Sequence, residues 1–352
     1  MAPYEHSWTG AVTAATLSLP PSVLSRMFGG PLVVDGQPLQ PAVRALLSIG
    51  GRLGLLGTDD SDIERQRRVI RRGAALVMPR TRGVTVTDTT FPGAVGDLAA
   101  RTYRPWEAGS QRQPTILYLH GGGWAAGDLD THDGVCRAIA VASQCNVVSV
   151  AYRLAPEHPY PAGLEDVVSV FRYLRDHPTA DGVPGVVAVM GDSAGGNLAA
   201  ALSIVIRDAD EDPPVALGLI YPATDLRMQQ PSIELFAEGF YLTKPEMVWY
   251  RSLYAPDPEQ WTDPLISPLL AEDLSNLPPA WIWTAGFDPL RDEGEAYAQR
   301  LEAAGNEVRY RCYEDQIHGF VSMGILPGGM ARTMDIGRQM GAVARGHADD
   351  AN

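Results

Sequence analysis

The sequence predicts a protein of the α/β class, with a mostly parallel, eight-stranded sheet that carries helices on both faces. Three observations lead to this prediction. Strand-like and helical segments alternate from about residue 82, apolar residues are spread evenly over the 352 residues, and a serine between two glycines separates one strand-like segment from the helical segment after it. This alternation is typical of a sheet that binds ligands at the carboxyl ends of its strands. Functional residues are therefore expected just after strand-like segments.

The expected sheet is built from strand-like segments spread along most of the chain. They are residues 84–91, 98–105, 115–120, 147–153, 186–191, 215–222, 280–286 and 308–314. No helical pattern separates the first two, so these are expected to form an antiparallel edge. Helical patterns between the later strands cover residues 163–177, 195–210 and 294–305.

Two regions stand outside this alternation, one ahead of the sheet and one inserted into it. They contain helical patterns at residues 39–53, 61–77 and 243–257. Both regions are expected to fold over the carboxyl edge of the sheet. The chain is thus expected to divide into four parts. They are an N-terminal helical segment (residues 1–80), a first part of the core (81–225), an insertion (226–262) and a second part of the core (263–352).

Composition excludes several classes of partner. The formal net charge of −14 argues against nucleic acid or an anionic membrane, because both would be repelled. Cys136, Cys145 and Cys312 cannot all pair and show no C-x-x-C spacing, which favours a reducing compartment and no structural zinc. The start of the chain has no basic region ahead of its mildly apolar middle, and no apolar run approaches the roughly 18 residues of a spanning helix. A cytoplasmic protein without stable membrane insertion is expected, and a homodimer is compatible with the sequence.

A glycine-rich loop follows the strand-like segment 115–120, in the stretch "ILYLHGGGWAAGD". Bare backbone at the end of a strand serves close contact with a ligand or a reacting atom, either as a phosphate cradle or as an oxyanion hole. Gly121, Gly123 and Ala126 satisfy a relaxed dinucleotide pattern. That pattern lacks an acidic residue about 20 positions further on, and bulky Trp124 stands inside it. The loop is therefore a weak candidate for dinucleotide binding.

The stretch "VVAVMGDSAGGNLAAAL" places Gly191-x-Ser193-x-Gly195 between a strand-like and a helical segment. A turn this tight needs small residues beside the serine, and it exposes the hydroxyl above the helix N-terminus. Ser193 is therefore the candidate nucleophile, and it requires a base and an acid that orients the base.

His318 follows the last strand-like segment and Asp288 the one before it, so adjacent parallel strands are expected to bring these side chains together near Ser193. Asp292 and Asp315 are rival acids, but helix capping accounts for the first, and the second is too close to His318 in sequence. Among the remaining histidines, His120 is expected to brace the glycine loop. Surface or packing roles are expected for the others, which are His6, His132, His158, His177 and His347.

Some polar and aromatic residues are expected to be structural. Asp192 is interpreted as a buried hydrogen-bond brace, and Arg153 and Glu157 as residues that fix a loop beneath the glycine turn. The charged run at residues 62–72 is interpreted as a solvated helix face. Aromatic residues of the insertion are expected to pack, with one or two of them lining a pocket; they are Trp249, Tyr250, Tyr254 and Trp261.

From about residue 80 to 325 the chain resembles the hormone-sensitive-lipase-like branch of the α/β-hydrolases, the bacterial family IV carboxylesterases. The resemblance rests on "HGGGW", "YRLAPEHPYPAGLED", "GDSAGGNLA", "YPATD", "DPLRDEG" and "IHGF". It implies Ser193 as nucleophile, His318 as general base and then acid, and Asp288 as the orienting carboxylate. It also implies that residues 1–80 and 226–262 form a helical cap, and that the oxyanion is bound by the backbone N–H groups of Gly122, Gly123 and Ala194.

The sequence therefore predicts a serine carboxylesterase that acts on short- to medium-chain, uncharged acyl esters, with no metal or organic cofactor. A hydrolase of amides, thioesters or acetylated metabolites would use the same residues and is the nearer alternative. A non-catalytic ligand receptor on this fold is the more distant one, because such receptors lack the histidine that His318 supplies here.

Overall fold

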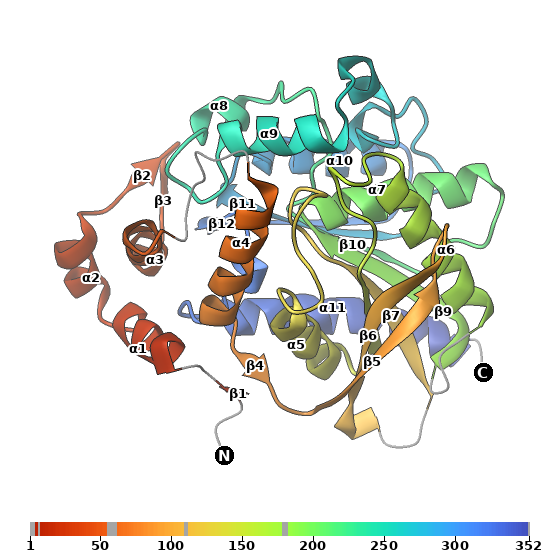
Figure 1. Cartoon of the computed structure of the whole chain (residues 1–352), viewed down its shortest axis with the longest axis horizontal. Helices are drawn as coiled ribbons and strands as arrows, with labels where there is room; N and C mark the ends of the chain where they lie inside the picture. Colours follow the sequence, from red (N-terminus) through yellow and green to blue (C-terminus); the bar gives the residue numbers. More distant parts are fainter. Residues whose placement is uncertain (1–3, 6–7, 55–61, 109–111, 178–181, 351–352) are drawn as a thin grey trace.

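The computed structural model describes residues 4–5, 8–54, 62–108, 112–177 and 182–350 (Figure 1). At its centre is an 8-stranded sheet with the order β12-β11-β10-β9-β7-β8-β6-β5. Its strands are β5 (Val84–Pro92), β6 (Asp97–Pro105), β7 (Gln113–Leu119), β8 (Asn146–Val150), β9 (Gly182–Asp192), β10 (Leu217–Ile220), β11 (Ala280–Phe287) and β12 (Val308–Ile317). Every strand-like segment predicted from the sequence thus lies in this one sheet.

The sheet is parallel except at one edge. The six strands from β12 to β8 in the sheet order are all parallel to one another, whereas β5 is antiparallel to β6 and β6 is antiparallel to β8. The predicted antiparallel edge is confirmed. Because β7, β9, β11 and β12 are parallel, their carboxyl ends meet at the same edge, and the predicted site residues follow directly after them.

Helices cover both faces of the sheet, and β7 shows how its residues divide between them. Leu117 and Leu119 join the core under one set of helices, while Ile116 and Tyr118 join the core under the other, as expected for alternating strand side chains. The first set is α6 (Ala162–Asp176), α7 (Ala194–Asp208) and α10 (Arg291–Ala303); the second is α5 (Asp133–Ser143) and α11 (Gly329–Asp350). The first set matches the predicted helical patterns, but α5 and α11 lie outside them.

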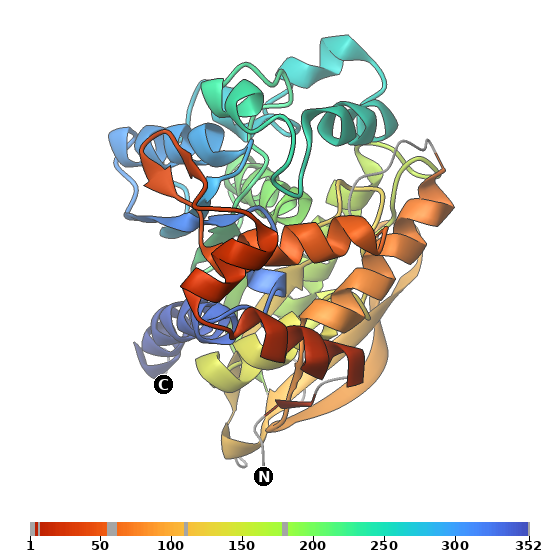
Figure 2. The same cartoon turned by 90° about the vertical axis from the view of Figure 1, so that its left-hand side faces the viewer.

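The N-terminal part of the chain gathers on one side of the molecule (Figure 2). Its elements are β1 (Tyr4–Glu5), α1 (Trp8–Leu17), α2 (Pro21–Phe28), β2 (Val33–Val34), β3 (Gln37–Pro38), α3 (Pro41–Arg52), α4 (Ile63–Val77) and β4 (Arg80–Thr81). Leu17, Leu24 and Val43 form a hydrophobic cluster with Phe287 and Ile317, the last residues of β11 and β12. These helices therefore pack on the carboxyl edge of the sheet.

The insertion contributes two further helices, α8 (Pro231–Leu235) and α9 (Lys244–Tyr254), which Figure 1 shows at the top of the view. A capping box starts α9, because Thr243 accepts a hydrogen bond from the Glu246 N–H and the Glu246 carboxylate accepts one from the Thr243 N–H. Gln66 of α4 donates to the Tyr250 hydroxyl at 3.0 Å, which joins the N-terminal helices to α9. Short 3₁₀ helices span Trp106–Ala108, Pro258–Thr262, Pro268–Leu270 and Phe320–Ser322. No helix in the described part of the chain has the length and apolar character needed to cross a bilayer.

Candidate active site

Ser193 occupies the sharp turn between β9 and α7. Its φ of 56° and ψ of −119° are strained for a residue with a side chain, as expected of a nucleophile elbow. The turn is tight enough that a Cβ on Gly195 would lie 2.0 Å from the Leu119 carbonyl oxygen. Glycine is therefore required beside Ser193 by the approach of β7.

His318 and Asp288 meet Ser193 at the carboxyl edge of the sheet. His318 Nε2 lies 3.0 Å from the Ser193 Oγ, and His318 Nδ1 lies 2.8 Å from the Asp288 Oδ2. Asp288 is fully buried, and its Oδ1 accepts a hydrogen bond from the Leu290 N–H at 2.9 Å. The structure thus joins the three sequence-predicted residues in one hydrogen-bonded chain.

The rival acids lie elsewhere. Asp292 accepts a hydrogen bond from the Ser232 N–H at 2.8 Å, and Asp315 accepts one from the Gln316 side chain at 2.9 Å. The position of Asp292 at a helix start predicts that it caps this helix, but α10 has no side-chain cap and Asp292 instead accepts a hydrogen bond from the first turn of α8. That interpretation is corrected, because the insertion folds back onto the start of α10.

The glycine loop presents backbone donors beside Ser193. A Cβ on Gly122 would lie 2.3 Å from the Ala126 carbonyl oxygen, and one on Gly123 would lie 2.3 Å from the Tyr250 ring. Their φ values of 122° and 61° also favour glycine. Within the described residues, no acceptor is found for the N–H groups of Gly122, Gly123 or Ala194, the last being the first residue of α7. These are the three donors that the family resemblance implies.

Asp192 holds the glycine loop against the serine turn. Its carboxylate accepts hydrogen bonds from the Gly121 N–H at 3.0 Å and the Tyr118 hydroxyl at 2.9 Å, and His132 Nε2 lies 3.2 Å away. Burial favours the neutral acid, but the charge of His132 and the donated hydrogen bonds outweigh it, so the pKa of Asp192 is lowered. Asp192 is thus a buried brace, as the sequence predicted.

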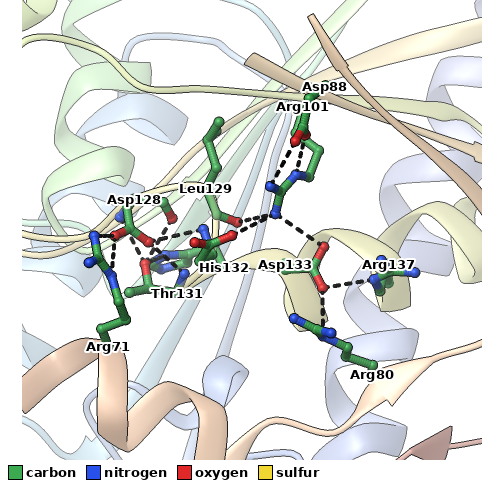
Figure 3. Close-up of polar contacts among 11 residues, drawn as sticks. Arg71, Arg80, Asp88, Arg101, Asp128, Leu129, Thr131, His132, Asp133 and Arg137 are labelled. Atoms are coloured by element: carbon green, nitrogen blue, oxygen red, sulfur yellow. Dashed lines mark hydrogen bonds and ion pairs between the residues drawn. The ribbon is translucent and has the colours of Figure 1, made fainter. Parts of the chain in front are cut away.

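His132 has a larger role than the sequence indicated. Of the surface or packing role predicted for it, the structure shows the packing role, since His132 is buried, and its second ring nitrogen lies 2.9 Å from the Thr131 hydroxyl. Figure 3 shows His132 between the Thr131–Asp128 turn on one side and the ion pairs of Asp133 on the other. Asp133 pairs with Arg80, Arg101 and Arg137, which fixes the start of α5 to β6 and to β4. No sequence motif marks these contacts of His132 and Asp133, because the residues that make them lie in four separate segments, around residues 80, 101, 131–137 and 192.

His120 supports the same loop from below. Its ring stacks on Tyr152 with centroids 4.4 Å apart, and its Nδ1 lies 2.9 Å from the Gly121 carbonyl oxygen. Burial, together with the nearby charge of His132, lowers the pKa of His120 to about 4. The imidazole is therefore neutral at physiological pH.

This shift predicts a pH-dependent loss of stability. Between the unfolded pKa of about 6.5 and the folded value, the unfolded chain binds a proton at this position that the native state does not, so stability falls as the pH falls. We expect the free energy of unfolding to drop by about 2 kcal/mol more in the wild type than in His120→Gln on going from pH 7 to pH 5. Urea denaturation of both proteins at both pH values measures this difference, and an equal drop in both would contradict it.

Ser193 and His318 lie on the wall of a cavity of about 210 Å³. Its lining is mostly apolar, and many of the apolar residues come from α3, α4 and the insertion, including Leu46, Ile49, Val69, Ile70, Leu226, Met228, Leu242 and Met247. Tyr250 lines it too, whereas Tyr254 stacks on Trp124 with centroids 4.5 Å apart, so the aromatic residues of the insertion divide between lining and packing. The described residues on this wall include carboxyl groups but no lysine or arginine.

Two of these carboxyl groups have raised pKa values. Burial raises the pKa of Glu246 and raises that of Glu293 well above its ordinary range. Glu293 accepts hydrogen bonds from the Thr224 and Asp225 N–H groups, and its second oxygen has no partner among the described residues. Its buried carboxyl group therefore lies on the cavity wall with one oxygen bound to backbone N–H groups. The same part of the chain contains no group of three or more His, Cys, Asp or Glu residues arranged to hold a metal ion.

Comparison with known proteins places the chain in a family. A family model described as the alpha/beta hydrolase fold matches residues 116–322. The chain belongs to this α/β-hydrolase family, which confirms the fold and the family predicted from the sequence. It is 43% identical to the carboxylic ester hydrolase LipN of Mycobacterium tuberculosis over 86% of this chain and 82% of that protein. It is 40% identical to the carboxylesterase NlhH of the same organism, over 71% and 78% of the two chains.

Solved structures agree. An ester hydrolase from the metagenome of Lake Arreo, determined with a bipyridine phosphonate derivative, has a TM-score of 0.82 and 39% identity, over 86% of this chain and 98% of that one. A hyperthermophilic esterase from the archaeon Pyrobaculum calidifontis has a TM-score of 0.76 and 38% identity, over 86% and 97%.

Proposed function

We propose that the protein is a serine carboxylesterase that hydrolyses short- to medium-chain, uncharged acyl esters through an acyl-enzyme. The observation that carries this proposal is the hydrogen-bonded chain from Asp288 through His318 to Ser193 on the wall of an apolar cavity. The relatives named as carboxylic ester hydrolase and carboxylesterase support the same reaction class. A receptor function is disfavoured, because His318 is present and contacts the serine.

In the first half of the reaction, the Ser193 Oγ attacks the ester carbonyl carbon and its proton passes to His318 Nε2. The carbonyl oxygen becomes an oxyanion, which the N–H groups of Gly122, Gly123 and Ala194 bind. Asp288 holds the imidazole in the tautomer that accepts this proton and stabilises the imidazolium. The carbon–oxygen bond to the alcohol then breaks, and the alcohol leaves with the proton from His318.

The second half repeats these steps with water. His318 takes a proton from a water molecule, whose oxygen attacks the acyl carbon and forms a second oxyanion in the same site. Collapse of this intermediate breaks the bond to Ser193, and the proton on His318 returns to the Ser193 oxygen. The carboxylic acid is released and the enzyme is regenerated, with no cofactor in the balance.

We propose further that residues 1–80 and 226–262 act as a cap over this site. Support comes from the cavity lining that α3, α4 and the insertion supply. None of the described residues before Leu46 lines the cavity. The helices α1 and α2 would therefore support the cap from behind rather than touch substrate.

An apolar cavity of limited volume beneath a cap predicts a limit on acyl chain length. Each methylene buried in it adds about 0.8 kcal/mol of binding until the cavity is full, after which further carbons stay in water or displace the cap. We expect kcat/KM for p-nitrophenyl esters to be highest between about two and eight acyl carbons, without a jump when the substrate forms an emulsion. A panel from acetyl to palmitoyl esters, together with triglyceride emulsions, measures this. Preference for long-chain emulsions over the butyryl ester would contradict the cap argument.

A charged acyl group provides a second test with the same panel of esters. The described wall of the cavity offers no lysine or arginine, so a carboxylate at the end of the acyl chain would lose its hydration without gaining a partner. The p-nitrophenyl hemisuccinate should therefore be a much poorer substrate than the butyryl ester of similar length.

A further inference from the structure

Arg67 of α4 makes contacts that its neighbours on the helix do not share. Its guanidinium donates to the carbonyl oxygens of Ala125 at 2.9 Å and Ala155 at 3.1 Å. It also pairs with both carboxylate oxygens of Glu157, each at 2.8 Å. Its side chain is 21% exposed, whereas that of Arg68 is 57% exposed and reaches Asp62 only at 4.0 Å. The interpretation of residues 62–72 as a solvated helix face is therefore wrong for Arg67.

The carbonyl groups that Arg67 binds belong to two loops that meet beside the glycine turn. Ala125 closes that turn, because its N–H donates to the Gly122 carbonyl oxygen at 3.3 Å and the Ala126 N–H donates to the same oxygen at 2.9 Å. The second loop is attached by the Ala155 N–H, which donates to the Trp124 carbonyl oxygen at 2.9 Å. The guanidinium thus closes a bridge from α4 across the glycine turn to the second loop.

Glu157 keeps this bridge in place. The bidentate pairing fixes the plane of the guanidinium, which leaves its other N–H groups aimed at the carbonyl oxygens. The pairing lowers the pKa of Glu157 to about 2, so the carboxylate stays ionised at the pH values used for ester assays. Lysine could keep the charge but could not make the same set of planar contacts.

A second attachment joins α4 to the continuation of the loop. Arg71 donates to the Asp128 carboxylate, whose other oxygen accepts from the Thr131 N–H at 2.7 Å. Figure 3 shows this contact at the point where the loop leads to His132. Because the Arg71 side chain is 60% exposed, this pair is expected to contribute less than the Arg67 bridge.

We propose that Arg67 is a positioning residue for the oxyanion hole, acting through the Ala125 and Ala155 carbonyl groups to hold the Gly122 and Gly123 donors in place. The proposal rests on the proposed esterase function. In this proposal α4 has two roles. It lines the substrate cavity, and through Arg67 it also affects the rate of the chemical step. Displacing a donor by a fraction of an ångström weakens its bond to the oxyanion more than its contacts with the uncharged ester.

The test compares Arg67→Gln with Arg68→Gln, the same substitution one position further along the helix. For Arg67→Gln we expect kcat for the butyryl ester to fall on the order of 10-fold with KM nearly unchanged. The affinity for a trifluoromethyl ketone, which forms an oxyanion on the serine, should fall by a similar factor. Arg68→Gln should match the wild type in both measurements. Arg67→Lys provides a second variant that retains the charge, and its kcat should also fall.

If Arg67→Gln fails to fold, Arg67→Lys is judged by the same measurements. Wild-type kcat and wild-type ketone affinity in the folded Arg67 variants would overturn the proposal. A rise in KM with unchanged kcat would also overturn it, because that result would indicate a role in substrate binding alone. Failure of the proposed function would show differently, as absence of ester hydrolysis in the wild type itself.

Discussion

Replacing Ser193 with alanine is expected to abolish ester hydrolysis, with a fall in kcat on the order of 10⁶-fold. The Ser193 hydroxyl oxygen is the nucleophile of the first half of the proposed mechanism, and without it His318 and the oxyanion donors can assist only slow, direct attack of water on the ester. The variant should fold, because alanine removes one oxygen atom from a turn that the backbone of β9 and α7 defines. Rates with p-nitrophenyl butyrate measure the loss.

Ser169→Ala provides the matched control. Its hydroxyl donates to the Pro92 carbonyl oxygen at 3.1 Å, on the edge strand β5, which β7, β8 and β6 separate from the strand that leads to Ser193, so activity should stay near the wild-type value. A fluorophosphonate probe should label the wild type and the control but not Ser193→Ala. Substantial hydrolysis by Ser193→Ala would exclude Ser193 as the nucleophile.

Replacing Asp288 with asparagine is expected to lower kcat by about 10³- to 10⁴-fold while the fold stays intact. The amide is nearly the same size as the carboxylate, but its NH₂ group facing His318 Nδ1 would favour the tautomer that carries its proton on Nε2. That tautomer cannot accept the proton of Ser193. The charge that stabilises the imidazolium is lost as well.

Asp292→Asn is the matched control for this prediction. It alters a carboxylate four residues further along the chain, which binds the Ser232 N–H and has no contact with His318 among the described residues. We expect kcat of Asp292→Asn to stay within about threefold of the wild type, because the weakened hydrogen bond costs about 1 kcal/mol of folding stability and leaves the contact between Asp288 and His318 in place. The reverse ranking of the two variants would reassign the orienting acid.

The sheet could be predicted from the sequence because its inner strands are short apolar runs, while the outer strands β5, β6 and β12 mix polar and apolar residues in short strand-like segments. The helix α11 could not, since its glycines disfavour a helix on propensity alone. The structure explains the glycine at position 341, because a Cβ there would lie 2.3 Å from the Ser143 carbonyl oxygen at the contact between α11 and α5. The helix α5 was missed because it is buried on most sides and shows no polar stripe.

The functional site, too, could be predicted from the sequence only in part. Ser193, Asp288 and His318 each follow a strand, so strand order alone indicates that they share one edge of the sheet. The contacts of His132 and Arg67 carry no such signal. His132 reaches Asp192 from a helix start, and Arg67 reaches Ala125 across 58 positions of sequence, from a run of charges that resembles any exposed helix. Only the packing of α4 brings Arg67 to the glycine loop, and only the packing of α5 on the sheet brings His132 to Asp192.

The central claim is that Ser193 forms a covalent acyl-enzyme with an ester substrate. Mass spectrometry of enzyme quenched in acid during turnover of p-nitrophenyl butyrate tests it most directly. We expect a butyryl adduct on the peptide that contains Ser193, formed with a burst of p-nitrophenol and absent from Ser193→Ala. Full hydrolysis with no adduct on that peptide, or with the adduct on another residue, would contradict it.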